Sequence, residues 1–317
     1  MSDIVVFIDQ PGDSLGKAHR ELLTFAHRAG TPVAVVVGVV PAGVLAELGS
    51  YGVVQVFSSE QAELTNYSVV PKAEFLATIA VKVGTRAVLT GNSSEQKDIA
   101  ARVAVSLAAG VISDAVGLDE QLVAEKSVLA GSYSVRAKTT SPVSVIALKS
   151  NSTEPEVSPN PQQAVLESVT VDFSTAAWGS KVLERTDRPA NGRPELSDAR
   201  IVVAGGRGVD GDFGPVEALA DALGAAVGAS RAATDAGWID HAAQVGQTGK
   251  TVSPQLYISV GISGAIQQKA GMQTAKLIVA VNKDADSPVF EIADLGIVGD
   301  LFKVLPQAVE EINRRRQ

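Results

Sequence analysis

The sequence predicts two doubly wound α/β domains, each with a mostly parallel sheet covered by helices on both faces. Short β-branched runs alternate with amphipathic stretches through residues 3–109, and the same alternation starts again at residue 201. Runs that are apolar on both faces and separated by helical stretches are typical of buried parallel strands. At 317 residues, the chain is long enough for two domains that each bury a core.

In the first half, the alternating pattern predicts a series of strands and helices. We expect strands at 3–9, 32–37, 53–57 and 87–89, and helices at 15–29, 44–48 and 97–109. After Leu118 the pattern predicts strands only, within 122–138 and 142–149. The polar, proline-rich segment SNSTEPEVSPNPQQ, residues 150–163, is predicted to be an exposed loop.

A second polar stretch, RTDRPANGRPELSD, is predicted to link the two domains, because it contains two prolines, a glycine and many charges. We place the N-terminal domain at 1–186, the linker at 187–198 and the C-terminal domain at 199–317. In the C-terminal domain, strands are expected at 201–204, 225–229, 256–260 and 277–281, with helices at 215–223 and 264–274. The parallel sheet predicted there is of the Rossmann-like kind.

Composition argues against several classes of protein. The formal net charge is −8, and the longest basic block is Arg314–Arg316, which argues against nucleic-acid binding. The chain has no cysteine, which excludes disulfides, zinc thiolates and cysteine-ligated clusters. The histidines, His19, His27 and His241, show no metal-ligand spacing. No metal site and no catalytic triad are predicted, so the sequence favours a carrier over a catalyst.

Targeting and membrane segments are not expected either. The N-terminus MSDIVVFID enters a predicted strand within four residues, which leaves no room for a signal or transit peptide. The longest apolar stretch, 32–48, is interrupted by glycine and proline and is better explained as a strand followed by a helix. A cytoplasmic protein without membrane insertion is therefore expected.

Two glycine-rich segments are similar to nucleotide-binding motifs, but each departs from its pattern. VGQTGKT, residues 245–251, ends like a P-loop, yet Gln244 stands where the first glycine is required. A G-x-G-x-x-G pattern occurs at 206–211, but the following helix is expected only near Pro215. An NAD-dependent oxidoreductase that uses the glycine turn near Gly206, and a non-redox nucleotide-binding protein built on the N-terminal α/β domain, remain alternatives.

Five segments with ligand-binding residue types follow predicted strands of the C-terminal domain: GGRG, GASR, VGQTG, SGAIQQ and VNKD. In open α/β sheets the binding crevice lies at the carboxyl ends of the strands, so we expect these loops to converge on one nucleotide-type ligand. Ser263 and Gly264 are expected to open a helix whose N-terminus would favour a pyrophosphate.

Longer runs show a family resemblance. PQLYISVGISGAIQQKAGMQTAKLIVAVNKD, residues 254–284, resembles the signature of the electron transfer flavoprotein alpha subunit, as do the GGRG, VGASRAATDAG and VGQTGK segments. LTGNSSEQKDIAARVAVSLAAGVISDAVGL and IADLGIVGDLFKVLPQAVEEI are similar to the same family, so the resemblance covers nearly the whole chain. It implies an electron carrier, not an enzyme, with FAD in its C-terminal domain. It also implies a heterodimer with a beta subunit that takes electrons from donor dehydrogenases and passes them to an acceptor oxidoreductase.

The resemblance also implies the residues that hold FAD. Arg207, Asn282 and Asp300 would lie towards the adenosine and phosphate end, and Leu301 belongs to the same cofactor-binding set. The flavin and its linker would be surrounded by Ser230, Arg231, Val245, Gly246, Gln247, Thr248, Ser263, Gly264, Ala265, Ile266, Gln267 and Gln268, with the Thr248 hydroxyl facing flavin N5.

Three of these residues have a particular chemistry. Arg231 would give the reduced flavin a permanent cation, although it could instead form a surface pair with Asp235. Asn282 could alternatively stabilise a turn. Gln268 stands where the family commonly has histidine, and its amide can donate a hydrogen bond but cannot carry charge. The resemblance therefore leaves the flavin potential open.

Overall fold

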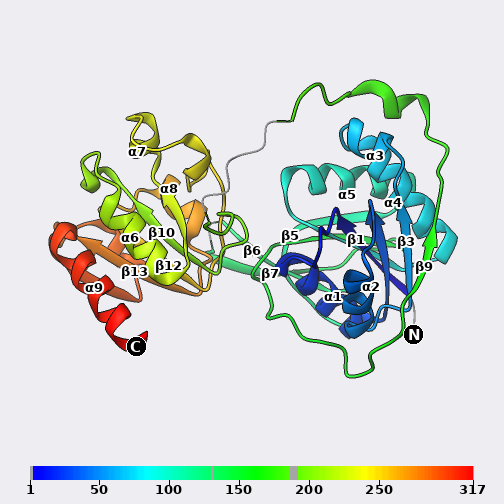
Figure 1. Cartoon of the computed structure of the whole chain (residues 1–317), viewed down its shortest axis with the longest axis horizontal. Coiled ribbons are helices and arrows are strands. Elements are labelled where there is room, and N and C mark those ends of the chain that lie inside the picture. Colours follow the sequence, from blue (N-terminus) through cyan, green and yellow to red (C-terminus); the bar gives the residue numbers. More distant parts are fainter. Residues whose placement is uncertain (1–2, 130, 186–191, 317) are drawn as a thin grey trace. The chain divides into compact units, whose positions relative to one another are not determined.

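A computed structural model describes residues 3–129, 131–185 and 192–316. The chain divides into two compact units, one within residues 1–127 and 134–187 and the other within 128–133 and 188–317, and Figure 1 shows both. Residues 187–191 of the predicted linker, and Thr186 before it, lie outside the described part of the chain.

The first unit is built on a sheet with strand order β7-β6-β5-β8-β4-β1-β2-β3-β9. Its strands are β1 (Asp3–Asp9), β2 (Thr31–Val37), β3 (Gln55–Ser59), β4 (Ala87–Gly91), β5 (Gly110–Leu118), β6 (Ala124–Val128), β7 (Tyr133–Ala137), β8 (Ser144–Leu148) and β9 (Val165–Ser168). The pairs from β5 to β9 in this order are parallel, and β5 pairs with β6 antiparallel. The mostly parallel sheet predicted for this half is confirmed.

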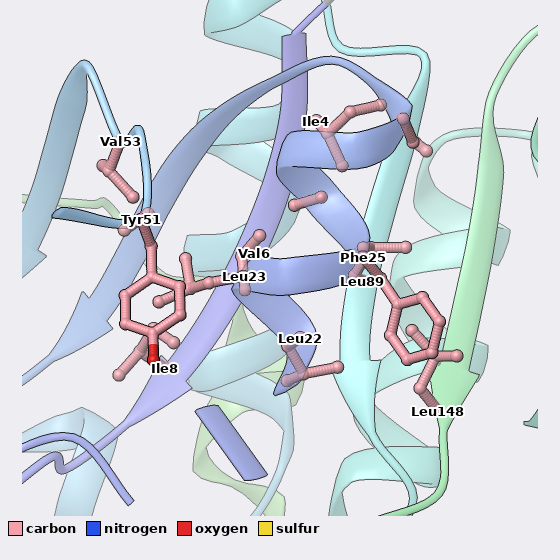
Figure 2. Close-up of a cluster of buried hydrophobic side chains, with 14 of the residues drawn as sticks. Ile4, Val6, Ile8, Leu22, Leu23, Phe25, Tyr51, Val53, Leu89 and Leu148 are labelled. Atoms are coloured by element: carbon pink, nitrogen blue, oxygen red, sulfur yellow. The ribbon is translucent and has the colours of Figure 1, made fainter. Parts of the chain in front are cut away.

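Helices cover both faces of this sheet (Figure 1). They are α1 (Lys17–Ala29), α2 (Ala42–Ser50), α3 (Glu63–Asn66), α4 (Val70–Val83) and α5 (Ser94–Ser106), with a 3-10 turn η1 (Thr175–Gly179). Alternate residues of β1 face opposite cores. Ile4, Val6 and Ile8 pack with α1 and α2, and Figure 2 shows the α1 side chains against them. Val5 and Phe7 pack with α4 and α5.

Helices α3 and α4 and strands β5 and β9 of this unit were not predicted, and the boundaries of the predicted elements differ by up to three residues. Helix α4 buries eight of its fourteen residues, so its apolar face is too wide to give a clear helical period in the sequence. Helix α5 begins at Ser94 and not at 97, because the Ser93 side chain accepts a hydrogen bond from the Gln96 amide at 3.2 Å and caps the helix.

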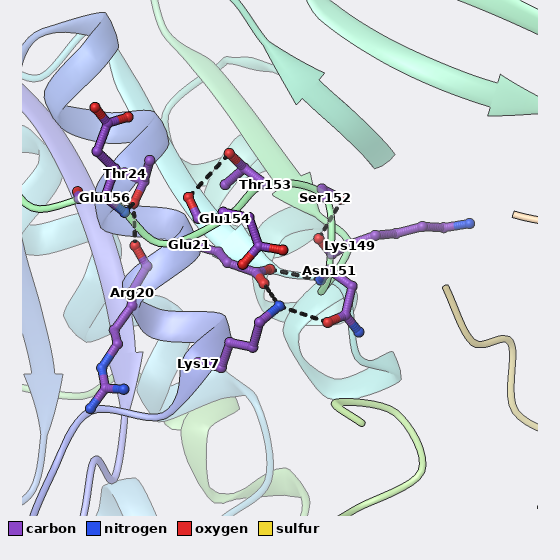
Figure 3. A network of polar contacts seen from close by, with 10 residues as sticks. All are labelled: Lys17, Arg20, Glu21, Thr24, Lys149, Asn151, Ser152, Thr153, Glu154 and Glu156. Atoms are coloured by element: carbon purple, nitrogen blue, oxygen red, sulfur yellow. Dashed lines mark hydrogen bonds and ion pairs between the residues drawn. The ribbon is translucent and has the colours of Figure 1, made fainter. Parts of the chain in front are cut away.

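The segment 150–163 is a loop, as predicted, but it is not wholly exposed, since Asn151 and Ser158 are 4 % and 8 % exposed. Figure 3 shows why: Lys17 donates to Glu21 and, over 2.7 Å, to Asn151 Oδ1, while the Asn151 amide donates to Glu21 Oε2 at 2.7 Å. These bonds tie the loop to α1.

The second unit has a five-stranded parallel sheet with strand order β11-β10-β12-β13-β14. Its strands are β10 (Ile201–Gly205), β11 (Ala226–Ala229), β12 (Leu256–Val260), β13 (Leu277–Asn282) and β14 (Leu295–Val298). Its helices are α6 (Gly214–Leu223), α7 (Arg231–Asp235), α8 (Ile266–Met272) and α9 (Leu301–Arg316), with 3-10 turns η2 (Arg207–Val209), η3 (His241–Ala243) and η4 (Pro288–Glu291). The predicted fold class, two doubly wound domains with a parallel Rossmann-like sheet in the second, is confirmed.

Packing in the second unit again forms two cores. Helices α6 and α9 pack on one face, through side chains such as Leu219 and Leu305, whereas Met272 of α8 packs on the other. Leu196, within the predicted linker, is 5 % exposed and belongs to the α8 core. The described end of that stretch is therefore packed against the second unit.

The helix predicted at 264–274 is shorter than expected, and its predicted opening at Ser263 and Gly264 is wrong. Gly264 has φ +82° and Ala265 is extended with ψ 152°, so α8 begins only at Ile266. Strand β14 and helix α9 were not predicted. Among the described residues, no helix has the length and apolarity needed to cross a bilayer.

Candidate functional site

The order of the second sheet creates a crevice between β10 and β12. The chain leaves β10 towards β11 on one side and leaves β12 towards β13 on the other, so the two connections run in opposite directions from neighbouring strands. This switch point is where open α/β sheets bind ligands, outside the carboxyl ends of the strands.

Glycines let these two loops touch at the crevice. The Gly208 amide donates to Gly261 O at 2.9 Å, and a Cβ on Gly208 would lie only 2.8 Å from the Gly261 Cα. Gly261 has φ +61°, and a Cβ there would lie 2.9 Å from the Gly208 Cα. Only glycine fits this crossing without displacing backbone.

A cavity of about 730 Å³ lies at this edge, a size within the usual range for small-molecule and cofactor sites. Residues of all five loops that the sequence singled out line it, from Arg207 after β10 to Asp284 after β13. The five loops therefore lie together around one cavity, as the strand-end rule predicts.

Twelve of the sixteen residues assigned through the resemblance line this cavity: Arg207, Ser230, Arg231, Val245, Gly246, Gln247, Thr248, Ser263, Ala265, Gln267, Gln268 and Asn282. Four do not. Ile266 is 77 % exposed, and Leu301 is buried in the α9 core. Asp300 accepts from the Phe302 amide at 3.0 Å at the start of α9, and Gly264 lies against the Val289 backbone.

Nine further residues line the cavity that the assignment omitted: Gly208, Ala232, Asp235, Gln244, Gly261, Ile262, Lys283, Asp284 and Ser287. Lys283 and Asp284 follow Asn282 within the VNKD segment, so the strand-end rule could have included them. Gln244 stood out in the sequence only as the residue that broke the P-loop pattern.

The VGQTG loop is held in place by backbone hydrogen bonds to its neighbours. The Val245 amide donates to Ala229 O at the end of β11 over 2.9 Å. The Gln247 amide donates to Gln267 O over 2.8 Å, which ties the loop to α8. Thr248 Oγ1 accepts from Gln244 Nε2 at 2.9 Å. The loop therefore presents Thr248 from a fixed frame.

Asn282 organises the opposite wall of the cavity. Its Nδ2 donates to Ile262 O and to Ser287 Oγ, each at 3.0 Å, and its Oδ1 accepts from the Asp284 amide at 3.1 Å. Both amide protons are therefore used within the protein. The turn-stabilising interpretation of Asn282 matches these bonds.

The cavity is locally cationic in an acidic chain. Arg207, Arg231 and Lys283 line it together with Asp235 and Asp284, which leaves one net positive charge against −8 for the chain. Arg231 Nε lies 3.1 Å from Asp235 Oδ2, and the two side chains are 66 % and 52 % exposed. The surface pair that the sequence left open is formed, and both of its members line the cavity.

Two buried polar atoms of cavity residues have no hydrogen-bond partner within the described part of the chain. They are Ser230 Oγ and Gln268 Oε1, in residues that are 8 % and 7 % exposed. Gln268 Nε2 donates to Tyr257 Oη at 3.2 Å, and burial raises the pKa of the Tyr257 hydroxyl, which therefore stays neutral. Buried polar groups are normally paired, so both atoms favour a polar ligand in this cavity.

Comparison with known proteins gives matches over both units. Residues 195–273 match the family described as the electron transfer flavoprotein FAD-binding domain, and residues 4–174 match the electron transfer flavoprotein domain. The first match contains most of the cavity loops, from Arg207 to Gln268, and supports FAD as the cofactor.

Relatives match along the whole chain. The electron transfer flavoprotein subunit alpha of Mycobacterium leprae (strain TN) is 42 % identical over 321 residues, which cover 100 % of both chains. That of Mycobacterium tuberculosis (strain ATCC 25618 / H37Rv) is 44 % identical over 321 residues, again with 100 % of both covered. That of Bacillus subtilis (strain 168) is 37 % identical over 290 residues, which cover 90 % of this chain and 88 % of the relative. The chain therefore belongs to the electron transfer flavoprotein alpha-subunit family.

Proposed function

We propose that this chain holds FAD in the cavity at the β10–β12 switch point and carries electrons from donor dehydrogenases to an acceptor oxidoreductase, in a heterodimer with a beta subunit. The observation that carries the proposal is the cavity itself. It is lined by five loops of one parallel sheet edge, and most of its wall lies within the match to an FAD-binding domain.

The donor set of the cavity fits FAD. Arg207 and Lys283 provide positive charge for a diphosphate. The guanidinium group of an arginine can donate two parallel hydrogen bonds to the oxygens of one phosphate. The Gly208–Gly261 crossing brings the backbones of two loops together in the cavity wall. Ser230 Oγ and Gln268 supply unpaired polar atoms for a polar ring or its linker.

We assign the two ends of the cavity as the family resemblance implies. Arg207 and Asn282 lie on the adenosine and phosphate side, with Arg207 as the charge and Asn282 as the organiser of its loop. Ser230, Arg231, Thr248 and Gln268 lie on the flavin side. Bound FAD supplies the redox chemistry, and these side chains hold the ring, position it and balance its charge.

The four assigned residues outside the cavity have supporting roles in this proposal. Asp300 and Leu301 fix the start of α9, one through its hydrogen bond to the Phe302 amide and the other through its burial. Gly264 permits the turn into α8. Ile266, with a large exposed apolar side chain, is free to contact a partner subunit.

We also propose that the chain is a carrier and not an enzyme. The two carboxylates in the cavity wall are already engaged. Asp235 pairs with Arg231, and Asp284 Oδ1 accepts from the Asp286 amide at 3.1 Å. Within the described part of the chain, the side-chain hydrogen bonds of these carboxylates go to Arg231 and to the Asp286 amide and not to a hydroxyl that they could activate.

Co-purification with the beta subunit tests the proposal. Oxidised flavin absorbs visible light, whereas NAD and AMP do not, so the heterodimer should be yellow and should bleach on reduction. Arg207→Ala combined with Lys283→Ala should weaken the retention of FAD. Lys303→Ala combined with Arg316→Ala, two exposed positions of α9 outside the cavity, is the matched control. A colourless heterodimer to which FAD cannot be added would contradict the proposed cofactor.

Two details of the proposal need their own tests. A cytoplasmic location is to be checked by cell fractionation with an antibody against the chain. The donor and acceptor are to be identified by mixing the reduced or oxidised heterodimer with single purified dehydrogenases and following the flavin absorbance.

A further inference from the structure

Three polar side chains form a connected series that ends in the cavity. Thr234 Oγ1 lies 3.2 Å from Gln244 Oε1, and Gln244 Nε2 donates to Thr248 Oγ1 over 2.9 Å. Thr234 and Gln244 are 2 % and 6 % exposed, whereas Thr248 is exposed and lines the cavity. We call this series the Thr234–Gln244–Thr248 relay.

The direction of the relay decides what Thr248 offers to a ligand. A hydroxyl has one proton to donate and two lone pairs that accept. Because Gln244 Nε2 donates to Thr248 Oγ1, the relay uses a lone pair of that hydroxyl and leaves its proton for the cavity. An amide turned the other way would take this proton, and Thr248 could then only accept.

The main chain of Gln244 is also fixed, which holds its side-chain amide between the two hydroxyls. Its carbonyl accepts from the Lys250 amide at 2.8 Å, and its amide donates to His241 O at 3.0 Å. In the direction given by the structure, the Thr234 hydroxyl donates to Gln244 Oε1. The same hydroxyl also lies 3.0 Å from Arg231 O, which accepts from it as well.

We propose that Gln244 is a positioning residue that makes Thr248 a hydrogen-bond donor towards bound FAD. The proposal rests on the proposed function, which places the flavin on the Thr248 side of the cavity. An oxidised flavin ring has hydrogen-bond acceptor atoms along the edge that Thr248 would face, so a hydroxyl that donates can pair with them. Gln244 acts through Thr248 and does not itself need to touch the cofactor.

Gln244→Glu reverses the relay with little change of shape. An ionised carboxylate can only accept, so it would take the Thr248 proton away from the cavity. It also adds a negative charge near an anionic cofactor. A double-mutant cycle with Thr248→Val separates these two effects. The added charge should weaken FAD binding whether residue 248 is threonine or valine, whereas the loss of the hydroxyl proton can weaken it only when Thr248 is present.

FAD dissociation constants of the heterodimer with the beta subunit give the first readout. We expect Thr248→Val to weaken FAD binding about fivefold, the usual worth of one hydrogen bond, and Gln244→Glu to weaken it at least as much. In the Thr248→Val background, the effect of Gln244→Glu should shrink by about the same fivefold factor. Gln247→Glu is the matched control, because it adds the same charge at the exposed cavity residue that precedes Thr248. It should change the affinity for FAD equally with Thr248 and with Val at that position.

NMR of the FAD-free chain with ¹⁵N-labelled glutamine gives the second readout. The Gln244 side-chain signals, assigned by their loss in Gln244→Glu, should shift and exchange faster with solvent in Thr248→Val. Unchanged signals would show that the amide does not donate to Thr248 and would overturn the proposal, as would a Gln244→Glu effect equal within twofold in both backgrounds. A wild-type heterodimer that binds no FAD would overturn the proposed function instead, whereas tight FAD binding without coupling would overturn the relay alone.

Discussion

Replacing Gly261 by alanine should destabilise the second unit more than the same replacement at Gly224. Both glycines have left-handed backbone, with φ +61° at Gly261 and +63° at Gly224. A Cβ at Gly224, after α6, would meet nothing within 4 Å, whereas a Cβ at Gly261 would lie 2.9 Å from the Gly208 Cα. The two variants therefore share the conformational strain and differ in the close approach.

The expected losses follow from these two terms. Left-handed backbone costs an alanine about 1–2 kcal/mol, so Gly224→Ala should lower the free energy of unfolding by roughly that amount. Overpacking against backbone adds about 1–3 kcal/mol, so Gly261→Ala should lose about 2–5 kcal/mol. The reduced entropy of the unfolded chain favours both alanines equally and cancels in the comparison.

Tryptophan fluorescence can report the second unit alone. The chain has two tryptophans, and Trp178→Phe would leave only Trp238, which packs against the α6–α9 core. Urea unfolding in this background gives the free energy of unfolding of each glycine variant. Equal losses at Gly261 and Gly224 would refute the reasoning that the loop crossing requires glycine. Gly261→Ala should also weaken FAD binding, and Gly224→Ala should leave it unchanged.

Three further predictions concern charged groups. Lys72 is 4 % exposed and donates to Asp9 at 2.6 Å and to Glu95 at 2.8 Å. Urea unfolding should show that Lys72→Met lowers the free energy of unfolding by about 3–5 kcal/mol, whereas Lys82→Met, on the exposed side of α4, should lower it by about 1 kcal/mol or less. Burial raises the pKa of Glu21 above 4.5, so the folded state binds its proton more readily. The wild type should gain stability relative to Glu21→Gln as pH falls through that raised pKa towards 4.5, and a pH-independent difference would contradict this. Arg231→Ala and Asp235→Ala should shift the first flavin potential by on the order of 20–40 mV in opposite directions, down and up, in potentiometric titrations; equal shifts would exclude an electrostatic effect of the pair.

Most of the strands, and the sheet edge at which the cavity lies, could be predicted because both depend on short-range patterns. A β-branched run marks each buried strand, and parallel strands place the following loops at one edge, so five loops could be assigned to one crevice before any geometry was known. Helix α4 could not be predicted in this way. It carries buried Lys72 and Phe75 on a broad face, and its register depends on the sheet that it covers.

Helix starts were the least predictable boundaries, since they depend on single backbone conformations. SGAIQQ has the composition of a helix from its first residue, but Gly264 takes a left-handed conformation and delays α8 to Ile266. This shift changes the argument about the ligand as well. A pyrophosphate at the start of α8 was expected because Ser263 and Gly264 were placed in its first turn, and they are instead part of the preceding loop.

Transfer of a family motif assigns a continuous run of residues, whereas a cavity selects side chains by their direction. Within Ser263–Gln268, Ile266 points to solvent and Gly264 packs on the Val289 backbone, while their neighbours line the cavity. Gln244 shows the opposite case. It lies one residue before the VGQTG run and was left out of the predicted cofactor-binding residues, because in the sequence it only broke the P-loop pattern. Its side chain nevertheless contacts Thr248 and lines the cavity. Residues that set the direction of a hydrogen bond to the ligand are thus found from the contacts between side chains, because the run that carries the motif need not contain them.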